Sequence, residues 1–384
     1  MSASDEALKV NIYPTGNAFT RNPIFLSVSS YSMATYSIRM NNEEVFKGNG
    51  IGEFRVNIAE IVETGITGTQ ILPESTNHIF AISGLSAEVT VRVVNEGEEC
   101  NLSFTAWKGG ISKKEFKRLL NLGTDIFNLK FLNESCNFFF TTRSNDWRII
   151  MRETELYPLC FIYPEHELKI TELLTGRSIF LPGTAGNLHA LNLETVRLEF
   201  FTGYGVLANL FDVYSGGTFA CRIGIEQSPT VRERYRLRFL NSYGVYEVFS
   251  LEGDAGVTPG MDEDDNAVFR RYDEITDDYY SERIRTDIQT VVTIKTGFKR
   301  PQEIRFLLDL LSSDDVYLAG YGREEIKVIP SAEEFSYRVR PEAPQNVTLK
   351  LTFADKESNW TGEITESGYR KPRVHSKEFS KQFN

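Results

Sequence analysis

The sequence predicts a mainly β protein with several domains. Short runs of β-branched and aromatic residues alternate with polar residues, and turn residues separate these runs at even spacing. The hairpin at 232–251 shows the pattern best, because Tyr235, Leu237 and Phe239 alternate with arginines before the turn Asn241-Ser242-Tyr243-Gly244. Helical periodicity is clear at only two places, so we expect antiparallel sheets with one short helix in each of the later domains.

Residues 1–108 form the first predicted domain. Six short strands are expected here, and Gly and Asn residues lie between them: Val10–Tyr13, Ile24–Ser29, Tyr36–Met40, Phe54–Ile58, Glu88–Val94 and Leu102–Trp107. Short strands separated by turn residues at this spacing are typical of an immunoglobulin-like or fibronectin-like β-sandwich. The Gly109-Gly110 pair marks its end.

The second predicted domain, 109–252, begins with a helix. Ser112 and Glu115 have the spacing of a capping box, and Phe116, Leu119 and Leu120 follow at helical spacing. Because Phe138-Phe139-Phe140 cannot alternate with polar residues, we expect a strand buried on both faces there. The predicted strands are Cys136–Thr142, Trp147–Arg152, Leu159–Tyr163, Leu168–Leu174, Val196–Phe201, Phe219–Ile225 and the hairpin.

The third predicted domain, 253–366, starts with an acidic loop and contains an amphipathic helix at 301–312. Pro301 suits a first helical turn, and Ile304, Leu307, Leu308 and Leu311 recur at helical spacing. We expect this helix to lie over a β-sheet. Residues 367–384 are polar and basic, which predicts a flexible tail.

Charge and composition limit the possible functions. The chain has a net charge of -11 and 41% hydrophobic residues, which argues against disorder and against a surface that binds nucleic acid throughout. No signal peptide and no apolar stretch long enough for a membrane helix is apparent, so we expect a protein kept in a cytoplasm or assembled there into a particle. The four cysteines are far apart in sequence, which favours buried thiols.

No catalytic motif is apparent, and we expect a protein without enzymatic activity, cofactor or metal. Glu165-His166-Glu167 lacks the second histidine of an HExxH zinc site. Asp262, Asp264 and Asn266 match three ligand positions of a calcium loop, but Ala267 stands where that loop requires glycine. A solvated acidic loop is therefore favoured over a calcium site.

Two charged segments are candidate subunit contacts. The first is the arginine face, formed by Arg232, Arg234, Arg236 and Arg238 on one side of the predicted strand. It could be an edge that discourages strand addition, or a partner for the acidic loop within or between subunits. It could also be a DNA-tracking surface if it lines a lumen. The basic tail could dock on an acidic partner. The candidate residues are Arg232, Arg234, Arg236, Arg238, Asp262, Asp264, Asp265, Arg370, Lys371 and Arg373.

Four segments together carry a family resemblance. They are Asn22-Pro23-Ile24, Trp107-Lys108-Gly109-Gly110-Ile111-Ser112, the run from Arg238 to Glu247, and the run from Phe306 to Leu318. These segments resemble uncharacterised structural proteins of tailed phages and prophages of Bacteroidetes. The order of elements in the third domain is similar to that of tail-tube and distal-tail domains, in which subunits pair their sheets into rings.

The resemblance implies a non-enzymatic virion component that forms a ring or hub in a tail or baseplate, assembled in the bacterial host cytoplasm. Its implied partners are copies of itself and other tail proteins, with no small-molecule substrate and no membrane. The alternative is a carbohydrate- or cell-surface-binding β-sandwich adhesin. In that case Trp107, Trp147 or Trp360 would stack on sugar rings, although a core position is the simpler expectation for each.

Overall fold

The structure is a computed structural model of the 384-residue chain, and it confirms the mainly β fold class. Two compact units are present: one comprises 1–256 and 292–352, and the other comprises 257–291 and 353–384. None of the described helices is long and apolar enough to cross a membrane. The described residues are 8–66, 77–143, 147–182, 188–231, 234–262, 268–283, 287–321, 324–332, 335 and 344–357.

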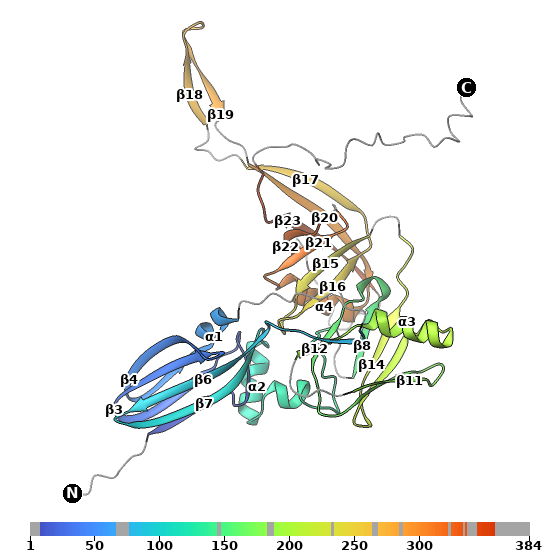
Figure 1. Ribbon diagram of the computed structural model, residues 1–384. Helices are drawn as coiled ribbons and strands as arrows, with labels where there is room; N and C mark the ends of the chain where they lie inside the picture. The colour runs from blue at the N-terminus through green and yellow to red at the C-terminus, as the bar shows by residue number, and fades with distance from the viewer. Residues whose placement is uncertain are drawn as a thin grey trace, which may run out of the picture. The chain divides into compact units, whose positions relative to one another are not determined.

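The N-terminal module of the first unit is a curled sheet of six strands with the features of a β-sandwich. The long strand β3 pairs with β1 over Phe25–Ser29 and with β6 over Thr35–Met40, and its register shifts between these two parts. The sheet therefore folds back around one core, as the blue ribbon of Figure 1 shows. The elements are β1 (Lys9–Tyr13), β2 (Asn17–Phe19), β3 (Phe25–Met40), β4 (Glu43–Asn57), α1 (Ala59–Gly65), β6 (Ser86–Asn95) and β7 (Glu98–Trp107).

Next comes a helical segment that contains α2 (Lys113–Leu122) and a π-helix (Phe127–Phe131). The predicted Ser112 cap is confirmed, because Ser112 Oγ accepts a hydrogen bond from the Glu115 amide at 3.3 Å. Phe138, Phe139 and Phe140 are buried as expected. The predicted strand at 136–142 was wrong, since these residues form bends rather than a sheet ladder.

Two sheets follow in the middle of the chain. The first has the order β5-β12-β9, with β5 (Ile79–Ala81), β9 (Leu159–Ile162) and β12 (Leu188–Leu191). The second has the order β11-β10-β13-β14-β8, with β8 (Arg148–Arg152), β10 (Leu168–Glu172), β11 (Ser178–Leu181), β13 (Leu210–Ser215) and β14 (Thr218–Glu226). Because β8 and β14 run parallel, this sheet is mixed, not purely antiparallel as expected.

Helix α3 (Leu193–Tyr204) covers the inner face of the five-stranded sheet and replaces the strand predicted at 196–201. Asn192 caps it by accepting hydrogen bonds from the amides of Glu194 and Thr195. Val196 and Phe200 lie in the same core as the sheet, where the Phe200 and Phe211 rings are 5.8 Å apart. Tertiary packing here overrides the β propensity of the local sequence.

The fourth sheet has seven strands in the order β16-β15-β21-β22-β23-β20-β17. The hairpin β15 (Tyr235–Leu240) and β16 (Tyr246–Leu251) joins this sheet through β21, so its assignment to the middle domain was wrong. The other strands are β17 (Ala255–Asp262), β20 (Asp287–Lys299), β21 (Val316–Ala319), β22 (Ile326–Ala332) and β23 (Gln345–Phe353). Strands β17 and β20 continue from the first unit into the second.

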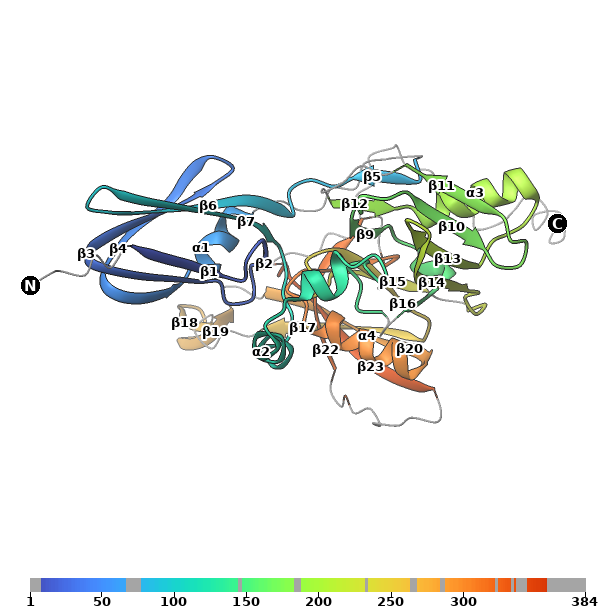
Figure 2. The same cartoon turned by 90° about the horizontal axis from the view of Figure 1, so that it is seen from below.

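Helix α4 (Pro301–Leu311) confirms the predicted amphipathic helix, and Figure 2 shows it beside β20 and β23. Phe306 packs against the rings of Phe239 and Phe249 at 5.2 and 6.0 Å. The buried face differs from the predicted one, because Phe306 and Leu310 are buried, while Leu308 is 37% exposed.

In the second unit, the segment predicted as an acidic loop contains a β-hairpin. Strand β18 (Val268–Asp273) pairs antiparallel with β19 (Asp278–Arg283). Asp273 shapes the turn by accepting hydrogen bonds from the Ile275 amide and the Thr276 hydroxyl, both at 3.0 Å. The acidic residues at this turn are therefore structural parts of a hairpin.

Candidate functional site

The arginine face predicted on β15 is only partly available for contacts. Arg238 Nε and Nη2 donate to Glu325 Oε2 at 2.9 and 2.6 Å, and the guanidinium lies over the rings of Tyr246 and Tyr317. Desolvation opposes the charge of Arg238, but the Glu325 carboxylate outweighs it and raises the Arg238 pKa. Arg238 therefore stabilises the seven-stranded sheet itself.

The remaining candidate contact residues either have exposed side chains or lie outside the described residues. Arg234 Nη2 donates to the Pro229 carbonyl at 2.6 Å, and Arg236 is exposed on β15. Asp262 ends β17, and its side chain is not among those described. Outside the described residues lie Arg232, Asp264, Asp265, Arg370, Lys371 and Arg373, together with Trp360.

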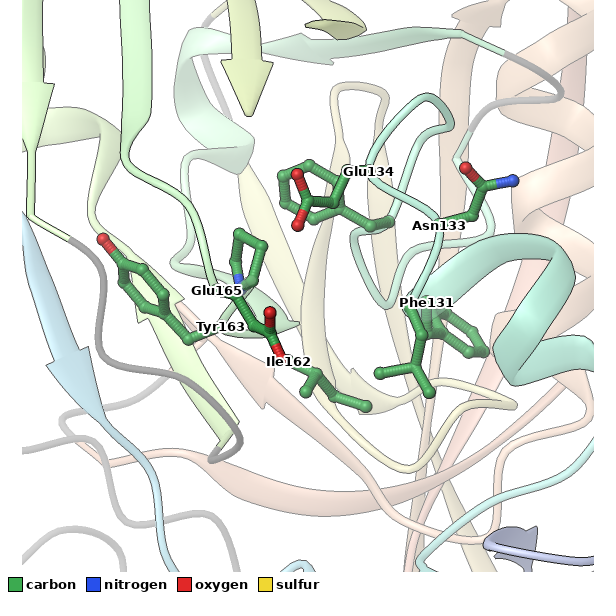
Figure 3. Close-up of a pocket in the computed structure, with 9 residues that line it drawn as sticks. Phe131, Asn133, Glu134, Ile162, Tyr163 and Glu165 are labelled. Carbon is green, nitrogen blue, oxygen red and sulfur yellow. The ribbon is translucent and has the colours of Figure 1, made fainter. Parts of the chain in front are cut away.

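A cavity of about 320 Å³ lies between the end of the π-helix segment and the end of β9. Figure 3 shows Asn133 and Glu134 on one wall, and Tyr163 and Glu165 on the other. The Tyr163 hydroxyl donates to the Pro182 carbonyl at 2.6 Å, and burial raises the pKa of Tyr163 to about 12. This phenol therefore remains protonated and structural at neutral pH.

Glu134 is one of two glutamates that line this cavity, together with Glu165. Partial burial alone would raise its pKa, but hydrogen bonds from His166 Nδ1 at 2.9 Å and Ser215 Oγ at 2.7 Å outweigh burial and lower it. The same contact raises the pKa of His166. In a serine triad the histidine lies between the serine and the acid, whereas here Glu134 lies between Ser215 and His166. This trio therefore lacks the order of a serine triad.

A second recess, of about 720 Å³, lies beside α2 and contains Lys130. Lys130 Nζ donates to the Thr141 carbonyl at 3.1 Å and lies 4.6 Å from the centre of the Tyr243 ring. Desolvation lowers the pKa of Lys130 to about 8. The recess therefore holds an amine that titrates near pH 8. Cys136 lies in the same recess.

The cysteines are only partly as expected. Cys160 and Cys221 are buried, whereas Cys100 and Cys136 are partly exposed. Burial raises the pKa of Cys221 far above its usual value, which makes that thiol unreactive. Among the described residues, no group of three or more His, Cys, Asp or Glu side chains is arranged to hold a metal ion.

Sequence reasoning missed a buried network of ion pairs within the first unit. Arg143 Nη1 donates to Glu155 Oε2 at 2.7 Å, and its Nε lies 3.3 Å from Glu247 Oε1. Arg152 makes a two-pronged contact with Glu303 at 2.7 and 3.2 Å. These residues are far apart in sequence, so no local motif marks the network.

The network also closes one edge of the seven-stranded sheet. Glu155 Oε1 accepts a hydrogen bond from the Ser250 amide at 2.9 Å, and Arg143 donates to the Val248 carbonyl. Both backbone groups belong to the edge strand β16, all of whose residues are buried. This edge is therefore unavailable for adding a strand from another chain.

Comparisons with known proteins identify no family. No protein-family model matches the chain, and no curated protein matches it. A solved structure of three titin immunoglobulin domains, an E-to-A mutated variant, matches at 7% identity over 74% of this chain and 93% of that chain. Its TM-score is 0.16, so the mainly β fold class depends on the strands described above.

Proposed function

We propose that the protein is a non-enzymatic structural component of a phage virion, which forms a ring or hub in the tail or baseplate. In this proposal the β18–β19 hairpin is the arm by which one subunit contacts the next. The resemblance noted in the sequence suggests the virion, and the hairpin is the single observation that carries the assembly role.

The hairpin has little means of stabilising itself. An isolated two-stranded hairpin is marginally stable in water, and stability usually requires a third strand or packing against a helix. Among the described residues of 257–291, no hydrophobic side chain is fully buried. A segment of this kind gains stability when it orders against a partner.

The side chains of the hairpin suit a protein contact. Tyr272 and Tyr279 face each other across the strands with ring centres 5.2 Å apart, and they are 46% and 64% exposed. Ile275 is 94% exposed in the turn. Exposed tyrosines beside an apolar tip are typical of the residues that anchor protein interfaces.

The closed β16 edge supports the same role for the hairpin. Because buried side chains already occupy the backbone groups of β16, a neighbouring subunit cannot extend the sheet there. At the opposite edge, β17 carries Pro259, which has no amide hydrogen to donate. The paired tyrosines of the hairpin therefore offer the better contact.

The proposal is tested by changing the hairpin tip in the full chain. The double variant Ile275→Asp and Tyr279→Ser should shift the mass distribution from oligomers to monomers in mass photometry. Leu174→Asp is the matched control, because Leu174 is 82% exposed in a turn of the first unit, and it should assemble as the parent does. Equal assembly of the double variant and the parent would contradict the role of the hairpin.

A further inference from the structure

The outer face of the five-stranded sheet β11-β10-β13-β14-β8 carries a row of aromatic residues and one lysine. In order across the sheet they are Phe180, Lys169, Tyr214, Phe219 and Trp147. Strand register brings the first four together: Phe180 pairs with Lys169, Lys169 with Tyr214, and Tyr214 with Phe219. Trp147 adjoins β8, and its carbonyl accepts a hydrogen bond from the Arg222 amide of β14.

Three of the rings are in contact, and Lys169 lies between them and Phe180. The ring centres of Tyr214 and Phe219 are 5.7 Å apart, and those of Phe219 and Trp147 are 6.1 Å apart. Trp147 is 48% exposed and Phe180 is 57% exposed, while the two rings between are half-buried. The core position expected for Trp147 was therefore wrong, whereas Trp107 is buried as expected.

This row lies on the face opposite the hydrophobic core. Ile170, Val213 and Ile223 alternate with the outward residues along their strands and pack in the core with α3. Because the core is complete without the row, the exposed rings do not contribute to it. Grouped exposed apolar rings of this kind are common at binding surfaces.

Polar residues run beside the rings on the same face. The Thr171 and Ser178 hydroxyls are hydrogen-bonded at 2.9 Å, and Arg222 forms a two-pronged ion pair with Asp212 at 2.7 and 2.9 Å. The Arg222 guanidinium also lies 5.6 Å from the Trp147 ring centre. Any ligand along the rings therefore meets hydroxyl and charged groups within reach.

Lys169 supplies the unbalanced charge of this surface. Its ammonium lies 5.8 Å from the Phe180 ring centre and 5.6 Å from that of Tyr214. In the part of the chain that the structure describes, no carboxylate lies within ion-pair distance of Lys169. Arg222, by contrast, is neutralised by Asp212.

We propose that this aromatic row binds an extended polysaccharide whose sugars carry carboxylate groups. Sugar rings with equatorial hydroxyls present flat C–H faces that pack on aromatic rings, and their rims carry hydroxyls for the neighbouring polar row. The carboxylates complement Lys169. This glycan-binding activity goes beyond the structural role proposed above and does not depend on it.

Two other ligand classes fit the surface less well. Single-stranded nucleic acid also stacks on aromatic rings, but its binding requires a groove of positive charge along the backbone. Here Lys169 is the one basic group of the row without a carboxylate partner among the described residues, so the row has no such groove. A protein partner would bury the Asp212–Arg222 ion pair, and removing these two charges from water costs free energy.

The test compares two glycans with the same backbone in isothermal titration calorimetry on the full chain. One is the hexamer of β-1,4-linked glucuronic acid, and the other is cellohexaose. We expect binding of the acidic hexamer, weakened about tenfold or more by Trp147→Ala or Phe180→Ala. Lys169→Gln should weaken it to the level of cellohexaose. Phe201→Ala is the matched control, because Phe201 is 54% exposed on α3 and lies outside the row.

Several results would overturn the proposal. They are no binding of the acidic hexamer, equal binding of cellohexaose by the parent protein, and an affinity that Trp147→Ala and Phe180→Ala leave unchanged. Tighter binding of a thymidine oligonucleotide would assign the row to nucleic acid instead. The melting temperature of each variant is measured as well, because an unchanged value shows that the variant is folded and that only its surface has changed.

Discussion

Arg143 and Glu155 form a buried ion pair at 2.7 Å, with only 4% and 1% of their side chains exposed. Arg143 belongs to the segment after the π-helix, whereas Glu155 follows β8, and both reach the edge strand β16. Burial alone would raise the pKa of Glu155, but the positive charges of Arg143 and Lys299 outweigh it and lower that pKa. The pair therefore joins separate parts of the first unit.

Removing the arginine should destabilise this unit strongly. Arg143→Met leaves Glu155 and Glu247 buried without their cation, and breaking a buried pair in this way costs about 3–5 kcal/mol. Arg118→Met is the control, because Arg118 pairs with Glu115 on the exposed face of α2 and such pairs contribute about 1 kcal/mol or less. Urea unfolding measures both. A similar free energy of unfolding for the two variants would contradict the role of the buried pair.

The close approach of Gly109 to the β15–β16 turn makes a second prediction. Gly109 has φ of 110°, and a Cβ there would lie 2.4 Å from the Tyr243 carbonyl carbon. The backbone would have to move, so Gly109→Ala should lower the melting temperature markedly. Gly123→Ala is the control, because Gly123 also has a positive φ, of 65°, where a side chain costs about 1–2 kcal/mol, but a Cβ there meets no atom within 4 Å. Equal melting temperatures would show that the turn does not pack against Gly109.

The pKa of Lys130 predicts a dependence of stability on pH. Desolvation lowers this pKa to about 8, whereas an unfolded lysine titrates near about 10.4. Between these values the folded protein binds fewer protons than the unfolded chain, so the contribution of Lys130 to stability rises with pH. The free energy of unfolding of the parent should therefore rise relative to that of Lys130→Met from about pH 8 to pH 10.

Denaturant unfolding at several pH values measures this difference. A difference that stays flat or falls over the interval would contradict desolvation of the Lys130 ammonium. Lys117→Met, which removes an exposed lysine of α2, controls for the general effect of losing one charge.

Helix-starting residues in the sequence correctly predicted the two helices that begin with a recognisable cap or proline. The cap at Ser112 and the proline at the start of α4 are both confirmed. Helix α3 was mistaken for a strand, because Val196, Phe200 and Phe201 favour strands, although Asn192 was a detectable cap. The fold class was predictable because β alternation is itself a local pattern.

The sites were not predictable in the same way. Arg143 lies in the segment after the π-helix and Glu247 lies on β16, more than a hundred residues further on, and the aromatic row exists only through the register of four strands. The arginines of β15 do alternate as expected, but Glu325 arrives from the loop before β22 to bind Arg238. Such pairings depend on topology, which spacing along one chain does not reveal.

The proposed role requires identical subunits to assemble into a ring or hub. The most direct test is electron microscopy of the purified full chain, combined with its mass distribution at several concentrations. We expect closed rings whose mass is a whole multiple of the 43.7 kDa subunit, and we expect the Ile275→Asp and Tyr279→Ser double variant to lose them. A protein that stays monomeric at every concentration would contradict it.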